Sequence, residues 1–201
     1  MATENITISK QDLLKAYREA EPSQQELMKK LFGADTFAIN FNVMERVKTF
    51  QDAIYELGND NKLVQQYNQI RSEFGNLMGK DIIAYLKLRI ITAAINEGWE
   101  PQFTKDEYRY YPYFFIYTKG EYEQLSDADK KRCVGRSGND AYANGGLVFA
   151  YTYYGSSYSN SSYGVRLAFK TSELAEYAGK QFLNIWADFV YKGVYHTNQH
   201  E

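Results

Sequence analysis

The sequence predicts an α+β fold, in which a helical N-terminal half precedes a small antiparallel sheet that carries a long C-terminal helix. The first observation is that apolar residues recur at helical spacing as far as Gly98. The second is a change near residue 100 to short aromatic and β-branched runs bounded by Gly, Ser and Asn. The third is the amphipathic segment 172–192, which returns to helical spacing. A sheet of about three strands is expected between the two helical parts.

The first predicted helices have recognisable ends. Ser23 and Glu26 match the S-x-x-E capping box ahead of LMKKLF, and Gly33 is a natural stop. Thr49 and Asp52 repeat this pattern ahead of AIYEL. Ser9 ahead of KQDLLKAYREA, with Asp12 three residues on, matches an N-cap and an acidic first turn. These patterns predict three short helices before residue 60.

Two longer helices follow. Residues 62–74 place apolar side chains at helical spacing, and residues 81–97 are apolar nearly all round before Gly98 ends the segment. A helix that is apolar on most of its circumference is buried. The segment 81–97 is therefore expected to be the central helix of the fold.

The second half predicts the sheet and its covering helix. The expected strands are 111–117, 146–154 and 165–170, with a short capped helical turn over 126–133 and an irregular loop over 134–146. Thr171 or Ser172 can then cap the C-terminal helix. The predicted organisation is a helical region over 1–98, an aromatic-rich α+β region over 99–195 that forms one compact unit with helix 81–97, and a disordered tail over 196–201.

Composition excludes several classes of protein. The formal charge is −2 with both signs interspersed, so binding of duplex DNA through phosphate neutralisation has no support. The lone Cys133 rules out an internal disulfide framework and fits a reducing compartment. The longest apolar segment, 82–95, carries Lys87 and Arg89 and is too short to span a bilayer. We therefore expect a soluble protein with no membrane partner.

Sequence signals for catalysis and metal binding are weak. One Cys and two His, at positions 196 and 200 in the tail, cannot assemble a Cys/His zinc site or supply a nearby general base to a serine. Basic neighbours could lower the pKa of the Cys133 thiol, but the end of a basic helical turn explains the same residues. We predict no metal, no cofactor and no catalytic residues.

The basic loop 130–140 leaves a second interpretation open. It contains GRSGND, in which two Gly flank Arg136, and it could present backbone N–H groups to an anion. It does not match the phosphate-binding pattern G-x-x-x-x-G-K-[ST], and a hairpin connection explains it equally. The alternative is a small enzyme that acts on a nucleotide or another phosphate-containing substrate through this loop.

The aromatic run 107–117 has bulky residues on both predicted faces. Alternation places Tyr111, Tyr113, Phe115 and Tyr117 on one face, and Tyr108, Tyr110, Phe114 and Ile116 on the other. Phe114, Phe115 and Ile116 are expected to fill the core. Whether the tyrosines of this run are buried or exposed is not decided by the sequence, because a buried Tyr needs a hydrogen-bond partner for its hydroxyl.

The stretch 151–164, YTYYGSSYSNSSYG, has the composition of antibody contact loops. There, Tyr provides contact area at low rotamer cost and small polar residues provide hydrogen bonds. A flexible hairpin connection is the alternative. The candidate binding residues are Tyr111, Tyr113, Arg136, Tyr153, Tyr154, Tyr158, Tyr163 and Arg166, the two Arg being suited to an anionic or carbonyl-bearing ligand.

Two segments carry a family resemblance. GWEPQFTKDEYRYYPYFF at 98–115 and RLAFKTSELAEYAGKQFLNIWADF at 166–189 resemble an uncharacterised family of short proteins from Bacteroides-type gut bacteria and their phages. The matching positions are Gly98 to Pro101, Tyr111 to Phe114, Gly145 to Leu147 and Arg166 to Phe182, within 81–190. The resemblance implies a phage or mobile-element context and brings no catalytic residues with it.

The leading hypothesis is a non-catalytic binding protein encoded by a phage or mobile element. It would act in the host cytoplasm or in the virion, either as a virion component or as an accessory protein that captures a host molecule. Its contact surface would be the Tyr-rich sheet and the 151–164 hairpin. The partner would be a protein, a small molecule or nucleotide, or a second copy of the chain.

Overall fold

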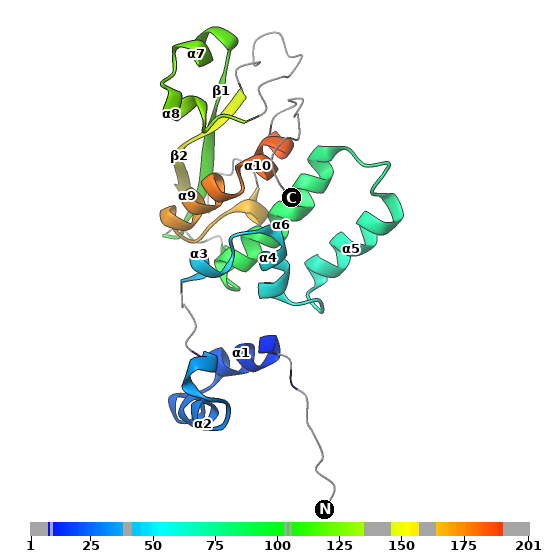
Figure 1. The fold of residues 1–201 in the computed structure, drawn as a ribbon, viewed down its shortest axis with the longest axis vertical. Coiled ribbons are helices and arrows are strands. Elements are labelled where there is room, and N and C mark those ends of the chain that lie inside the picture. Colours follow the sequence, from blue (N-terminus) through cyan, green and yellow to red (C-terminus); the bar gives the residue numbers. More distant parts are fainter. Residues whose placement is uncertain are drawn as a thin grey trace, which may run out of the picture. The chain divides into compact units, whose positions relative to one another are not determined.

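The computed structural model describes residues 8, 10–37, 42–102, 104, 106–134, 146–156 and 164–190. The chain forms two compact units, Met1–Arg46 and Val47–Glu201 (Figure 1). The unit boundary therefore lies well before the change in composition near residue 100. The expected tail over 196–201 lies outside the described residues.

The first unit is helical. It contains α1 (Lys10–Glu19), α2 (Pro22–Phe32), the 3-10 helix η1 (Ala34–Phe37) and α3 (Val43–Arg46). The predicted capping box at Ser23 is wrong, because α2 already begins at Pro22 and its box is formed by Glu21 and Gln24. A proline lacks the N–H that would be unsatisfied at the first helical position, so it suits this start. The predicted stop at Gly33 is confirmed, with φ at +85°.

The second unit is built around one buried helix. Here α4 (Phe50–Leu57) and α5 (Lys62–Phe74) pack against α6 (Lys80–Asn96), which also contacts the C-terminal helices. The predicted box at α4 is confirmed: the Asp52 N–H donates to Oγ1 of Thr49 at 3.1 Å, and the Thr49 N–H donates to the Asp52 carboxylate at 2.8 Å. The expectation of a central helix at 81–97 is confirmed as well.

The sheet has two strands, β1 (Tyr108–Tyr117) and β2 (Gly146–Ser156), paired antiparallel. The third predicted strand, 165–170, is wrong. Its first part is the 3-10 helix η2 (Val165–Leu167), and only Phe169 bridges to Tyr110 of β1. The α+β class is nonetheless correct.

The segment 168–170 is hydrogen-bonded on both edges, by Tyr110 of β1 and by the side chain of Asn96. Phe169 exchanges both backbone hydrogen bonds with Tyr110, at 2.9 and 3.0 Å. On the opposite edge of the segment, the Asn96 amide donates to the Ala168 carbonyl at 2.8 Å and accepts from the Lys170 N–H at 3.2 Å. The Asn96 amide thus takes the backbone groups that another strand would have paired.

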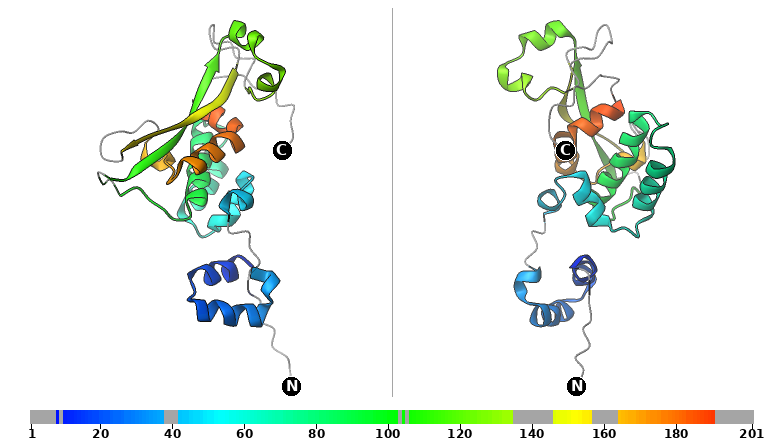
Figure 2. Two further views of the ribbon diagram at one scale, coloured as in Figure 1. Left: turned by 90° about the vertical axis from the view of Figure 1, so that its left-hand side faces the viewer. Right: turned by 45° about the vertical axis from the view of Figure 1, so that its right-hand side comes forward.

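Two helices cover one side of the β1–β2 ribbon (Figure 2). These are α9 (Ser172–Gln181) and α10 (Leu183–Val190), and Thr171 caps the first of them as predicted. The expected single long helix is interrupted at Phe182, where φ is −108° and ψ is 29°. Trp186 of α10 is fully buried and its ring lies 5.6 Å from that of Phe114.

Two short helices connect the strands. The capped turn predicted at 126–133 is confirmed as α8 (Asp127–Lys130), for which the Ser126 hydroxyl accepts from the Asp129 N–H. A further helix, α7 (Lys119–Gln124), was not predicted. Its T-x-x-E capping box, Thr118 with Glu121, is nevertheless legible in the sequence.

Gly179 allows the close approach of α9 to the ribbon, and Gly179→Ala is expected to disrupt it. A Cβ there would lie 2.5 Å from Cδ2 of Phe149 and 2.7 Å from Cβ of Pro112. Overpacking of this kind lowers the free energy of unfolding by about 1–3 kcal/mol. Urea denaturation followed by circular dichroism measures the change. The control is Gly120→Ala in α7, where a Cβ meets no atom within 4 Å; equal losses in the two variants would contradict the close packing.

Asn96→Ala is expected to lower the free energy of unfolding by about 2–4 kcal/mol, because a buried backbone group left without its partner costs about 1–3 kcal/mol. The variant would orphan the Ala168 carbonyl and the Lys170 N–H. The matched control is Asn68→Ala, at an exposed position of α5. An unchanged urea midpoint for Asn96→Ala would show that this amide does not support the fold.

Asn96→Asp makes the same contact dependent on pH. The introduced carboxyl can donate to the Ala168 carbonyl only when protonated, so its folded pKa is expected to lie above its unfolded value. The stability contributed by that hydrogen bond is therefore present below the unfolded pKa and lost as the pH rises through the folded pKa. Urea midpoints of variant and wild type, compared between about pH 4 and pH 8, test this sign. A difference that stays constant with pH would refute it.

Candidate functional site

The side of the β1–β2 ribbon away from α9 and α10 carries a set of exposed aromatic rings. Tyr113 and Phe115 of β1 and Tyr151 and Tyr153 of β2 are 41–48% exposed, and we call these four residues the aromatic face. They share one side because Tyr113 pairs with Tyr151, and the strand alternation places Phe115 and Tyr153 there as well. The other side of the ribbon, with Pro112, packs on α9 and α10.

The rings of the aromatic face contact one another. Tyr113 and Tyr151 are stacked, with centroids 4.7 Å apart and planes 20° apart. Phe115 lies edge-on to both, at 6.4 Å from Tyr113 and 6.3 Å from Tyr151. Such cross-strand aromatic pairs hold one another in place and reduce rotamer freedom. The face is therefore pre-organised as well as exposed.

A β-bulge sets the register of this face. The pairing shifts between Tyr113 and Phe114, so that Tyr113 pairs with Tyr151 whereas Phe114 pairs with Phe149. The extra residue, Ala150, lets Tyr151 lie on the same side as Val148, which pairs with Phe115. Without the bulge, strict alternation would place Tyr151 and Val148 on opposite sides.

The face carries no ionised group at neutral pH. The residues of the face are all Tyr or Phe. Beyond it, at the end of β1, burial raises the pKa of the Tyr117 hydroxyl, and the neighbouring Cys133 thiol and Asp129 carboxylate raise it further. Arg109 points to the same side of the ribbon but is only 1% exposed. A partner would thus meet rings and hydroxyl groups.

The predicted binding tyrosines divide into different environments. Tyr113 and Tyr153 belong to the aromatic face, whereas Tyr111, which pairs with Tyr153 on the same side of the ribbon, is only 2% exposed. Tyr154 is 59% exposed but lies on the other side of the ribbon, with its ring 5.7 Å from that of Tyr108. The structure therefore brings only part of the predicted set together.

The predicted core residues of β1 are partly wrong. Phe114 is buried as expected, but Phe115 is 48% exposed and Ile116 is 46% exposed. Phe115 lies on the side away from α9 and α10, and Ile116 lies near the end of β1 that extends past these helices (Figure 2). The alternation of residues along β1 predicts correctly which side chains share a side of the strand. It does not show how much of β1 is covered by α9 and α10.

Several predicted residues lie outside the described part of the chain. These are Arg136, Tyr158 and Tyr163, together with most of the basic loop 130–140. The part of that loop that is described ends α8: Arg132 pairs with Asp129 at 3.4 Å, and the ammonium of Lys130 lies 5.8 Å from the ring of Tyr122. Nothing in these contacts supports a phosphate site.

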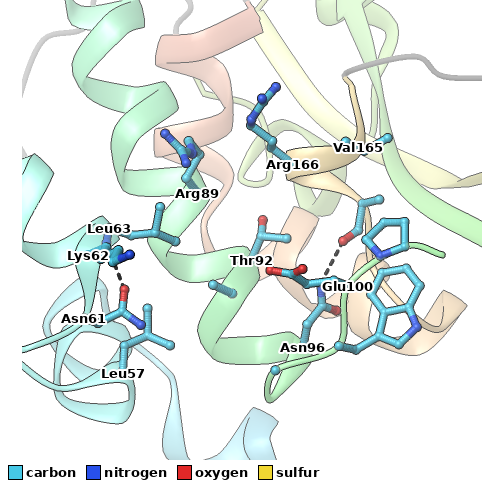
Figure 3. Close-up of a pocket in the computed structure, with 15 residues that line it drawn as sticks. Leu57, Asn61, Lys62, Leu63, Arg89, Thr92, Asn96, Glu100, Val165 and Arg166 are labelled. Atoms are coloured by element: carbon cyan, nitrogen blue, oxygen red, sulfur yellow. Dashed lines mark hydrogen bonds between the residues drawn. The ribbon is translucent and has the colours of Figure 1, made fainter. Parts of the chain in front are cut away.

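Arg166 lines a separate pocket of about 590 Å³ (Figure 3). Its walls come from four segments: the α4–α5 junction, the inner face of α6 from Arg89 to Asn96, the turn 98–101 and residues 165–168. The Asn96 hydrogen bond to Ala168 forms part of the wall. All four segments belong to the second compact unit.

The pocket contains residues that the sequence analysis missed. Arg89, Thr92, Trp99 and Glu100 line it together with Arg166. One signal was available: Arg89 and Thr92 are polar residues three positions apart in a mostly apolar helix, so they share a face. The approach of residues 165–168 to that face could not be read from the sequence.

Two further searches were negative within the described residues. None of them form a group of three or more His, Cys, Asp and Glu side chains able to hold a metal ion. None of the helices in those ranges has the length and apolar character needed to cross a membrane. Comparison with protein-family models, curated proteins and solved structures finds no match for the chain.

Proposed function

We propose that this protein is a non-catalytic binding protein that docks a partner protein on the aromatic face. The observation that carries the proposal is the stacked, half-exposed pair Tyr113 and Tyr151 on the side of the ribbon away from α9 and α10. Contiguous exposed aromatic surface on a folded protein marks an interaction site. The described start of the Tyr-rich stretch 151–164 contributes Tyr151 and Tyr153 to this face.

The composition of the face favours a protein partner. Tyrosine is enriched among the residues that dominate interface energies, because its ring supplies area and its hydroxyl supplies a hydrogen bond. Ring contacts among Tyr113, Tyr151 and Phe115 already limit the rotamers of these side chains, which lowers the conformational entropy lost on binding. Nucleic acid is disfavoured, because the face offers no cation to neutralise phosphates.

The biological setting is part of the proposal and rests on the family resemblance. The segments 98–115 and 166–189 resemble proteins of Bacteroides-type gut bacteria and their phages. A phage or mobile-element protein with an exposed contact face would serve as a virion-associated component or as an accessory protein that captures a host molecule. A second copy of the chain is the other protein partner that this face would fit.

The double substitution Tyr113→Ser with Tyr151→Ser tests the proposal. Loss of central aromatic anchors typically weakens an interface by about 2 kcal/mol or more, which is roughly thirtyfold. The experiment is quantitative affinity capture from a Bacteroides-type lysate, followed by binding measurements with the purified captured protein. Sedimentation velocity of the chain alone tests self-association. The double variant is expected to lose the captured protein, or the self-association, while keeping its fold by circular dichroism.

The matched control is Phe74→Ser, which removes an aromatic ring that is 46% exposed at the end of α5. This control should bind like the wild type. Identical capture and identical sedimentation for wild type, control and double variant would refute the proposed function.

A further inference from the structure

We infer that the pocket between α6 and residues 165–168 binds a small phosphate-bearing ligand of the nucleoside monophosphate class. The inference is separate from the partner-binding proposal, because none of the residues that line the pocket belongs to β1 or β2. The volume, about 590 Å³, is ample for a ligand of this size.

The charge of the pocket is opposite to that of the chain. Its lining holds three cations, Lys62, Arg89 and Arg166, against one carboxylate, Glu100. The whole chain has a formal charge of −2. None of the three cations forms an ion pair with another described residue. A concave site in which unpaired cations outnumber carboxylates favours an anionic ligand.

Two arginines suit a phosphate group. Arg89 extends from α6 and Arg166 from η2, so they reach the pocket from different walls (Figure 3). A guanidinium presents paired N–H donors that match phosphate oxygens in a bidentate geometry, which a single ammonium cannot do. Lys62, at the start of α5, adds a third positive charge at another wall.

Thr92 provides an independent observation that points to a ligand. It is 4% exposed, and its Oγ1 has no hydrogen-bond partner among the described residues. A helical threonine often bonds the carbonyl one turn earlier, which this one does not. In Figure 3, Thr92 is drawn below the side chains of Arg89 and Arg166. A phosphate oxygen held by the arginines would give this hydroxyl an acceptor.

The remaining lining explains why the ligand is more than an inorganic ion. The indole of Trp99 and the ring of Pro101 form an apolar wall, against which a planar base can pack. Glu100 contributes an acceptor for the hydroxyl or amino donors of a nucleoside. An anion, a planar group and hydrogen-bond donors within one small molecule describe a nucleoside monophosphate.

Calorimetric titration of the full chain tests the inference. The probes are the four common ribonucleoside 5′-monophosphates, with adenosine and inorganic phosphate as their separate halves. At least one monophosphate is expected to bind with one-to-one stoichiometry, and at least tenfold more tightly than either half. Failure of all four to bind, or equal binding of inorganic phosphate alone, would overturn the inference.

Three variants assign the binding to this pocket. Arg89→Met and Arg166→Met are each expected to weaken the bound monophosphate by about tenfold or more. Thr92→Val should also weaken binding, yet leave the unliganded chain as stable as the wild type or more so, because it removes a hydroxyl that has no partner. The control Arg132→Met removes an exposed arginine outside the pocket and should change nothing.

The outcomes separate this site from the aromatic face. The variant with Tyr113→Ser and Tyr151→Ser should bind the monophosphate as the wild type does, even if it loses its protein partner. Loss of ligand binding in the Thr92→Val variant with wild-type stability supports the assignment. Unchanged affinity in Arg89→Met and Arg166→Met would show that the ligand binds elsewhere and would refute it.

Discussion

The second unit depends on one side-chain amide. Asn96 is 3% exposed at the end of the central helix, and it bonds both the carbonyl of Ala168 and the N–H of Lys170. Between these two residues, Phe169 pairs with Tyr110 of β1. The segment 168–170 is therefore held on one edge by a helix side chain and on the other by a strand. Through it, α6 is tied to the ribbon by contacts between residues more than seventy positions apart.

The exposure of the aromatic face follows from how the ribbon is covered. A two-stranded sheet is marginally stable alone and needs a hydrophobic partner. Here α9 and α10 supply that partner on one side, and Gly179 lets α9 approach Phe149 and Pro112 closely. Because tight packing is achieved on that side, the aromatic rings on the other side are not needed for the core. Half-exposed rings of this kind are available for contact with a partner.

The sequence predictions are confirmed where an element depends on residues that are close together in the sequence. The capping box of Thr49 and Asp52 and the helix 62–74 appear as expected, because caps and helical periodicity involve neighbours in sequence. The alternation of β1 also separated Tyr113 from Phe114 correctly. Only Phe169 of the predicted strand 165–170 pairs with β1, because Val165–Leu167 form the 3-10 helix η2. The opposite edge of residues 168–170 is bound by Asn96, a contact between residues more than seventy positions apart.

The candidate sites are only partly predicted by the sequence, because they too depend on contacts between residues far apart in the chain. The aromatic face is formed by two strands whose tyrosines are conspicuous in the sequence, so Tyr113 and Tyr153 could be named in advance. The pocket takes its lining from four segments, and two of its residues, Arg89 and Thr92, lie in a helix whose mostly apolar composition indicates chiefly a core. Arg166 was named for its charge, but its neighbours Arg89 and Thr92 become visible only once α6 and residues 165–168 are brought together.

The pocket and the ribbon that carries the aromatic face are joined by the backbone of residues 165–169, but the two sites have no side chain in common. Substitutions of side chains can therefore test one site without changing the other. Residues 165–168 line the pocket, while Phe169 immediately afterwards pairs with β1. Side-chain changes such as Arg166→Met remove a ligand contact and leave the backbone pairing in place. Changes at Asn96 act on the backbone of the shared segment, and so perturb the pocket wall and the ribbon together. A functional effect of Asn96 substitutions therefore says nothing about which site is used, whereas Thr92 and Tyr151 each report on one site alone.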